Sequence, residues 1–139
     1  MIILDTNVIS ELFNGRKDNG IFDWLDRHEE EGLYISVITV TELVFGTEFL
    51  PEGKRKQSFR EKIDQIVEDF DGRWLAFGDE AAYLYGAISA RRKSTGHAIE
   101  TKDAMIAAIC LQHGATLATC NTKDFEGLDL KLANPFEGA

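Results

Sequence analysis

Residues 1–7 of the chain read Met-Ile-Ile-Leu-Asp-Thr-Asn, and this stretch decides the fold. The apolar run 1–4 predicts a buried strand, because short continuous hydrophobic runs bounded by polar residues are typical of strands covered on both faces. The carboxylate of Asp5 follows at the end of that strand. Thr6 and Asn7 then supply a cap for a helix in which apolar residues recur at helical spacing.

The same alternation of short apolar strands and helices continues along the chain. It predicts a parallel sheet with helices on both faces, and 139 residues, 44% of them hydrophobic, are enough for one such domain. We therefore expect a single domain, residues 1–139, of the α/β class, with three layers (α/β/α) and a central, mainly parallel sheet. Strands are expected at residues 1–4, 33–36, 73–77, 115–119 and 128–132, and helices from Asn7 to Gly15 and at residues 19–30, 39–50, 54–70, 79–94 and 101–113.

Charge and hydropathy narrow the classes of function. The net charge of −9 argues against broad electrostatic binding of nucleic acid, so an RNA substrate would need local basic patches or bound metal. The dense basic clusters are residues 54–56 and 91–93, and each is either a solvated helix face or an RNA backbone contact. The sequence has neither a membrane-spanning run nor a signal peptide, so we expect a cytoplasmic protein without a membrane partner.

Acidic and amide residues follow several of the expected strands, and each has a local explanation. Asp5 fits either a helix cap or a first-turn acid, and Asp103 fits a first-turn acid that the helix macrodipole stabilises. Glu42 stands three residues after Thr39, which is a capping-box spacing, although Ser36 is an equally good cap. Asn121 fits a cap for the turn that precedes the last strand.

Taken together, these residues point to a shared site. The carboxyl ends of parallel strands meet at one edge of a sheet, and ligands bind outside that edge. Carboxylates crowded there repel one another, and a divalent cation relieves the repulsion. Oxygen ligands without a histidine or thiolate cluster suit Mg²⁺, or alternatively Mn²⁺. Such a site can activate water and stabilise charge on a phosphodiester.

Several motifs in these regions resemble those of PIN-domain proteins, in particular the VapC-type toxins of bacterial toxin–antitoxin pairs, which include FitB-like members. The resemblance covers nearly the whole chain, with the motifs in the same order. The motifs are LDTN at residues 4–7, SVITVTEL at 36–43 followed by Gly46, KDAMIAA at 102–108, ATCNTKDF at 118–125 and NPF at 134–136.

The resemblance implies a PIN-like fold and a magnesium-dependent endoribonuclease. It assigns Asp5, Glu42 and Asp103 to the acidic triad, with Asp5 and Asp103 as direct metal ligands. Some relatives carry aspartate where this chain has Asn121, so the fourth position falls to Asn121 or to Asp124. Substrate-positioning roles are implied for Thr6, Asn7, Thr119 and Asn121.

The resemblance also implies partners. They are an RNA substrate and a cognate antitoxin whose basic tail inserts an arginine among the carboxylates, with the toxin as a homodimer or in a complex with the antitoxin. Operator DNA would be bound only through the antitoxin, because the chain has no DNA-reading motif of its own. The alternative function is an antitoxin-binding module that acts in a DNA-bound autorepressor complex with weak nuclease activity. An aspartate-nucleophile phosphatase or receiver is disfavoured, since no second acid accompanies Asp5 at the required spacing.

Overall fold

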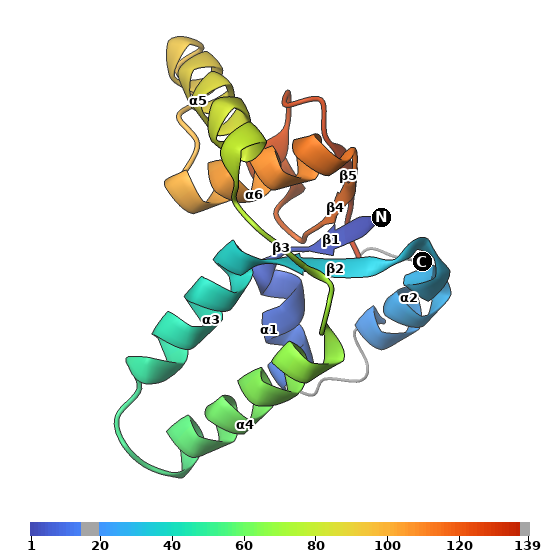
Figure 1. Cartoon of the computed structure of the whole chain (residues 1–139), viewed down its shortest axis with the longest axis vertical. Coiled ribbons are helices and arrows are strands. Elements are labelled where there is room, and N and C mark those ends of the chain that lie inside the picture. Colours follow the sequence, from blue (N-terminus) through green and yellow to red (C-terminus); the bar gives the residue numbers. More distant parts are fainter. Residues whose placement is uncertain (15–19, 137–139) are drawn as a thin grey trace.

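The computed structural model describes residues 1–14 and 20–136, so Gly15 and Asn19, expected helix boundaries, lie outside the described residues. The chain forms an α/β fold around a five-stranded sheet (Figure 1). No helix in residues 1–14 or 20–136 is long and apolar enough to cross a membrane. The elements are β1 (Ile2–Leu4), α1 (Thr6–Asn14), α2 (Ile21–His28), η2 (Glu29–Glu31), β2 (Leu33–Ser36), α3 (Val37–Glu48), α4 (Lys54–Asp69), β3 (Trp74–Leu75), α5 (Asp79–Ser94), α6 (Thr101–His113), β4 (Thr116–Ala118), η3 (Thr122–Phe125) and β5 (Lys131–Ala133).

The strand order is β3-β2-β1-β4-β5, and every described pairing is parallel. The expected α/β class and central parallel sheet are therefore confirmed. β1 lies at the centre, where Ile3 pairs with Tyr34 on one side and with Leu117 on the other. The chain order reverses direction between β1 and β4, and such a switch point is where open parallel sheets place their ligand sites.

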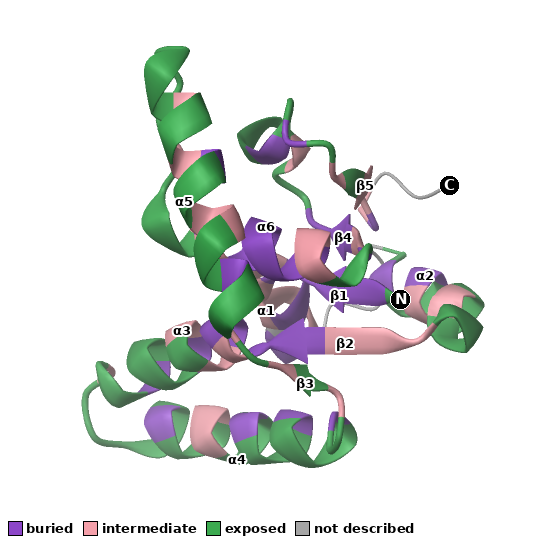
Figure 2. Cartoon of the chain, turned by 45° about the horizontal axis from the view of Figure 1, so that its top comes forward, coloured by how far each residue is buried: buried purple, intermediate pink, exposed green. Residues whose placement is uncertain are grey.

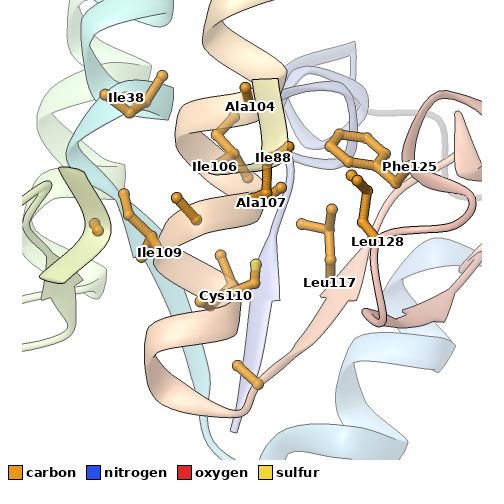
Figure 3. Packing of buried hydrophobic residues seen from close by; sticks show 14 residues of the cluster. Ile38, Ile88, Ala104, Ile106, Ala107, Ile109, Cys110, Leu117, Phe125 and Leu128 are labelled. Carbon is orange, nitrogen blue, oxygen red and sulfur yellow. The ribbon is translucent and has the colours of Figure 1, made fainter. Parts of the chain in front are cut away.

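The side chains of β1 divide the hydrophobic core into two layers, because neighbouring residues in a strand point to opposite faces. Ile3 packs on the side of α5 and α6, whereas Ile2 and Leu4 pack on the side of α1, α2 and α4. Figure 3 shows the first layer, in which Cys110 of α6 lies between Ile109 on one side and Leu117 of β4 on the other. β1 and the middle of α6 are buried, whereas α5 is largely exposed (Figure 2).

Three expected boundaries were wrong, each for a local reason. Thr6 lies inside α1 instead of capping it, because the carbonyl of Asp5 already accepts the first helical hydrogen bonds. α3 begins at Val37, since the Ser36 hydroxyl accepts a hydrogen bond from the Thr39 backbone N–H at 3.2 Å. The last strand begins only at Lys131, because the hydrophobic residues just before it are buried in a loop without strand pairing.

The carboxyl ends of β1, β2 and β4 meet at one edge of the sheet. A hydrogen bond of 2.9 Å from the Asp5 N–H to the Ala118 carbonyl joins the ends of β1 and β4. β2 leads directly into α3, and the first turn of α6 lies near the same edge through the packing of Ala104 against Ile3 and Ile38. The fold therefore places the loops that carry the candidate residues side by side.

Candidate active site

Asp5 is buried at the end of β1, with only 4% of its surface exposed. Its Oδ1 accepts the Thr6 backbone N–H at 2.9 Å. Its Oδ2 accepts the Asn7 side-chain amide at 3.0 Å and the Thr119 hydroxyl at 2.8 Å. A carboxylate has about four lone-pair positions, so Oδ1 keeps one for a further ligand. Asp5 therefore has a fixed orientation and one free acceptor position.

Thr119 holds this arrangement from the end of β4. Its fully buried hydroxyl donates to Asp5 and accepts hydrogen bonds from the Asn7 side-chain amide at 3.1 Å and the Asn121 backbone N–H at 3.0 Å. One donated and two accepted hydrogen bonds use the full capacity of a hydroxyl. The side-chain oxygen of Asn7, Oδ1, in turn accepts a hydrogen bond from the Cys120 backbone N–H at 3.1 Å. Thr119 and Asn7 thus lock the two strand ends together around the Asp5 carboxylate.

Glu42 points back towards this edge from α3. Its Oε1 accepts the Thr6 hydroxyl at 2.8 Å, and the hydroxyls of Thr6 and Thr39 lie 3.1 Å apart. Because the Thr6 proton is given to Glu42, Thr39 is the donor in that pair. The capping-box role for Glu42 was wrong, since Ser36 is the cap of α3. The other oxygen, Oε2, lies 4.0 Å from Nζ of Lys102.

Asp103 lies in the first turn of α6, partly buried. Burial and, in decreasing order, the charges of Asp5, Glu100, Asp124 and Glu42 together raise its pKa to about 6. Burial also raises the pKa of Asp5, against the hydrogen bonds that stabilise its ionised form. The sequence-predicted acids therefore lie close enough to oppose one another's ionisation, which is the arrangement that a cation relieves.

The two candidates for the fourth position differ in the structure. Asp124 is exposed in η3, and its charge raises the pKa of both Asp5 and Asp103. Asn121 binds Thr119 through its backbone N–H, and its side chain accepts only a hydrogen bond from the neighbouring cysteine. Of these two residues, Asp124 is the one whose charge acts on Asp5 and Asp103.

The residues of the site suit a hard divalent cation. Their donors are carboxylate, hydroxyl and amide oxygens, which Mg²⁺ prefers. No three Asp, Glu, His or Cys side chains in the described residues form a group that could hold a metal ion. Mg²⁺ does not require such a group, because it keeps several waters and uses one or two carboxylates. Asp5 has one free acceptor position, and the carboxylate of Asp103 forms no hydrogen bond with a described residue. These two groups could therefore supply the carboxylate ligands.

Three residues near the site had no site role in the sequence analysis. Thr39 was considered only as a cap, Lys102 had no role although it precedes Asp103, and Glu100 was not considered. Each belongs to the site through contacts or charges that cross between elements. For Lys102, the available signal was its position next to Asp103 at the start of a helix.

The raised pKa of Asp103 predicts that Asp103→Asn stabilises the metal-free protein at neutral pH. The folded state holds the proton up to about pH 6, whereas an unfolded Asp releases it near about pH 4. The charged carboxylate therefore destabilises the fold above about pH 6, and the penalty fades as the pH falls towards about 4. Solvent screening at this half-buried group reduces the expected gain to about 1 kcal/mol.

Urea unfolding of the metal-free protein between about pH 7 and pH 5 measures this gain. The matched control is Asp26→Asn, an exposed aspartate on α2. If Asp103→Asn is no more stable than the wild type at neutral pH, burial and the neighbouring acids do not oppose the ionisation of Asp103.

Known proteins share this fold and sequence. The sequence matches the PIN domain family over residues 2–130. It is 40% identical to VapC ribonuclease Y4jK of Sinorhizobium fredii over 100% of both chains, and 39% identical to toxin FitB of Neisseria gonorrhoeae over 98% of this chain and 99% of that protein. It superposes with a TM-score of 0.89 on a FitAB structure bound to a DNA fragment, at 39% identity over 98% of this chain and 96% of that one. The chain therefore belongs to the PIN-domain family and, within it, to the VapC- and FitB-type toxins.

Proposed function

We propose that this chain is the ribonuclease toxin of a type II toxin–antitoxin pair and cuts RNA with the help of Mg²⁺. The observation that carries the proposal is the buried carboxylate of Asp5, which hydrogen bonds hold in one orientation, together with Asp103, whose ionisation the charge of Asp5 opposes. The relatives named as a VapC ribonuclease and as toxin FitB support the class of reaction. We propose further that residues 1–139 act as one PIN domain in the cytoplasm, the compartment that holds the RNA.

Asp5 and Asp103 are the residues that would hold the ion. Mg²⁺, or Mn²⁺ in its place, would offset their negative charge and polarise the scissile phosphate. Thr119 and Asn7 keep Asp5 in one orientation, so little reorganisation is needed when the ion binds. Asp124 contributes the additional negative charge at the edge.

Glu42 is placed to orient the attacking water. Thr6 occupies its Oε1, which leaves Oε2 to accept a hydrogen bond from a water aligned with the phosphorus–oxygen bond that breaks. The ammonium group of Lys102 lies 4.0 Å from that oxygen. Thr6 and Asn121 line the same edge and would position the RNA strand.

Replacing Asp5 tests the proposal directly. Asp5→Asn keeps the shape of the side chain and removes its charge, so we expect RNA cleavage to fall by at least about 100-fold. The assay incubates the purified protein with RNA and Mg²⁺ and follows the products on a denaturing gel.

The matched control, Asp26→Asn, changes the same chemical group on an exposed helix and should cleave like the wild type. Chelation with EDTA should stop the wild type, and added Mg²⁺ should restore it. Equal cleavage by wild type and Asp5→Asn would show that Asp5 does not take part.

We propose that a cognate antitoxin covers a groove beside the acids. A cavity of about 360 Å³ lies between α1, α3 and α4 and is lined by Thr6, Glu42, Gly46 and Phe59. Its apolar walls fit the hydrophobic side chains of a peptide, and Glu42 at one end fits a basic residue. The FitAB structure bound to DNA supports an operator complex through the antitoxin. A homodimer is the expected assembly of the toxin itself.

Filling the groove should separate inhibition from cleavage. An added side chain at Gly46 meets no atom within 4 Å and would project into the groove, so Gly46→Leu should fold and cleave RNA. It should lose inhibition by the cognate antitoxin.

The control is Gly86→Leu on α5, where an added side chain also meets no atom within 4 Å. Titration of each variant with that protein in the cleavage assay measures inhibition. Normal inhibition of Gly46→Leu would place the antitoxin elsewhere.

A further inference from the structure

A second cavity, which the proposed chemistry does not use, is lined by a cluster of positive charges. It lies between the end of α5, the following loop and η3, and it has a volume of about 510 Å³. Its cationic wall consists of Arg91, Arg92 and Lys123, with His97 beside them. We name it the basic pocket. In a chain of net charge −9, such a concentration of cations needs an explanation.

The two arginines are held in place by neutral partners. Arg92 donates from Nε to the His97 carbonyl at 2.7 Å, and from Nη1 to the carbonyls of Asp124 at 3.0 Å and Glu126 at 3.4 Å. Arg91 donates to the Gly127 carbonyl at 2.6 Å. Carbonyl groups do not neutralise a guanidinium, so its positive charge remains. The Nη2 group of Arg92 forms no hydrogen bond with a described residue, which leaves donors for a ligand.

Few carboxylates compete for these cations. Arg91 lies 3.8 Å from Asp129, but both side chains are at least half exposed, so the pair is weak. Lys123 forms no ion pair with any residue that the structure describes. Glu126 also lines the pocket and is exposed. The pocket therefore keeps a positive balance that an anion can use.

The basic pocket and the acidic edge share one turn of the chain. Lys123 lines the pocket, and the next residue, Asp124, adds its charge to Asp5 and Asp103. Arg92 holds the carbonyl of Asp124 directly. Two consecutive residues, Lys123 and Asp124, therefore connect the pocket to the acidic edge.

We propose that the basic pocket binds a backbone phosphate of the RNA beside the scissile bond. The inference rests on the proposed ribonuclease function and adds the place where the strand is held. RNA approaching an acidic protein is repelled, and a local cluster of arginine and lysine offsets that repulsion. Phosphate contacts of this kind fix the position of the strand without reading its sequence. Arg92 supplies a planar donor group, and Lys123 supplies a mobile point charge.

Charge variants of the pocket test this inference. Lys123→Ala removes a cation that has no structural partner, whereas Lys93→Ala removes one from the same helix end outside the pocket. Binding of a fluorescent single-stranded RNA of mixed sequence is measured in an Asp5→Asn background, across a range of salt concentrations. We expect Lys123→Ala to raise Kd about fivefold and to reduce the slope of log K against log salt by about 0.7. Lys93→Ala should change neither quantity to that extent.

Glu126→Gln gives a change in the opposite direction. It removes the carboxylate that lines the pocket, so RNA should bind about twofold more tightly. In the cleavage assay with Asp5 intact, Lys123→Ala should raise KM and leave kcat near the wild-type value, because a phosphate next to the scissile one is held equally in the bound substrate and in the transition state.

The outcomes separate the two proposals. If the wild type cleaves RNA but Lys123→Ala and Lys93→Ala bind RNA with equal affinity, the proposed role of the basic pocket is wrong and the proposed ribonuclease function stands. Unchanged RNA binding by Lys123→Ala with a weaker antitoxin complex assigns the pocket to a protein partner and also overturns it. Absence of RNA cleavage by the wild type overturns the proposed function itself.

Discussion

The hydrogen bond from the Thr119 hydroxyl to Asp5 joins the ends of the two central strands, and the candidate site depends on it. Burial raises the pKa of Asp5, so its carboxylate needs fixed donors to stay oriented and charged. Parallel pairing of β1 with β4 supplies those donors, because it brings Asp5 and Thr119 to the same edge. The remaining acids then gather around a carboxylate whose position is already set.

The sequence predicted the layers and most of the acidic site for one reason. Hydrophobic periodicity reports burial, and burial on both faces of short strands specifies a parallel sheet with its carboxyl ends on one edge. Asp5, Glu42 and Asp124 come after the ends of β1, β2 and β4, so their proximity follows from the topology. Asp103 follows α5 and not a strand, so its place at this edge depends on how α6 packs on the sheet. The same reasoning located the last strand poorly, because a buried residue such as Leu128 can lie in a loop without strand pairing.

Contacts between distant segments could not be predicted in this way. Local spacing made Thr39 and Glu42 a capping box, but the partner of Glu42 is Thr6, which lies 36 residues earlier. Ser36 and Thr39 both carry hydroxyls at plausible cap positions, and only the start of α3 distinguishes them. The basic cluster at residues 91–93 also depends on contacts with a distant segment. Arg91 and Arg92 donate hydrogen bonds to carbonyls of η3 and of the loop after it, whereas Lys93 lies outside the basic pocket.

The central claim is that Thr119 orients Asp5 to bind a divalent cation. Calorimetric titration of Mg²⁺ into the wild type and Thr119→Val tests it, because valine fills the same volume without the hydroxyl. The account predicts binding to the wild type, affinity about 10- to 100-fold lower in Thr119→Val, and recovery in Thr119→Ser. Equal Mg²⁺ affinity of the wild type and a folded Thr119→Val would contradict it.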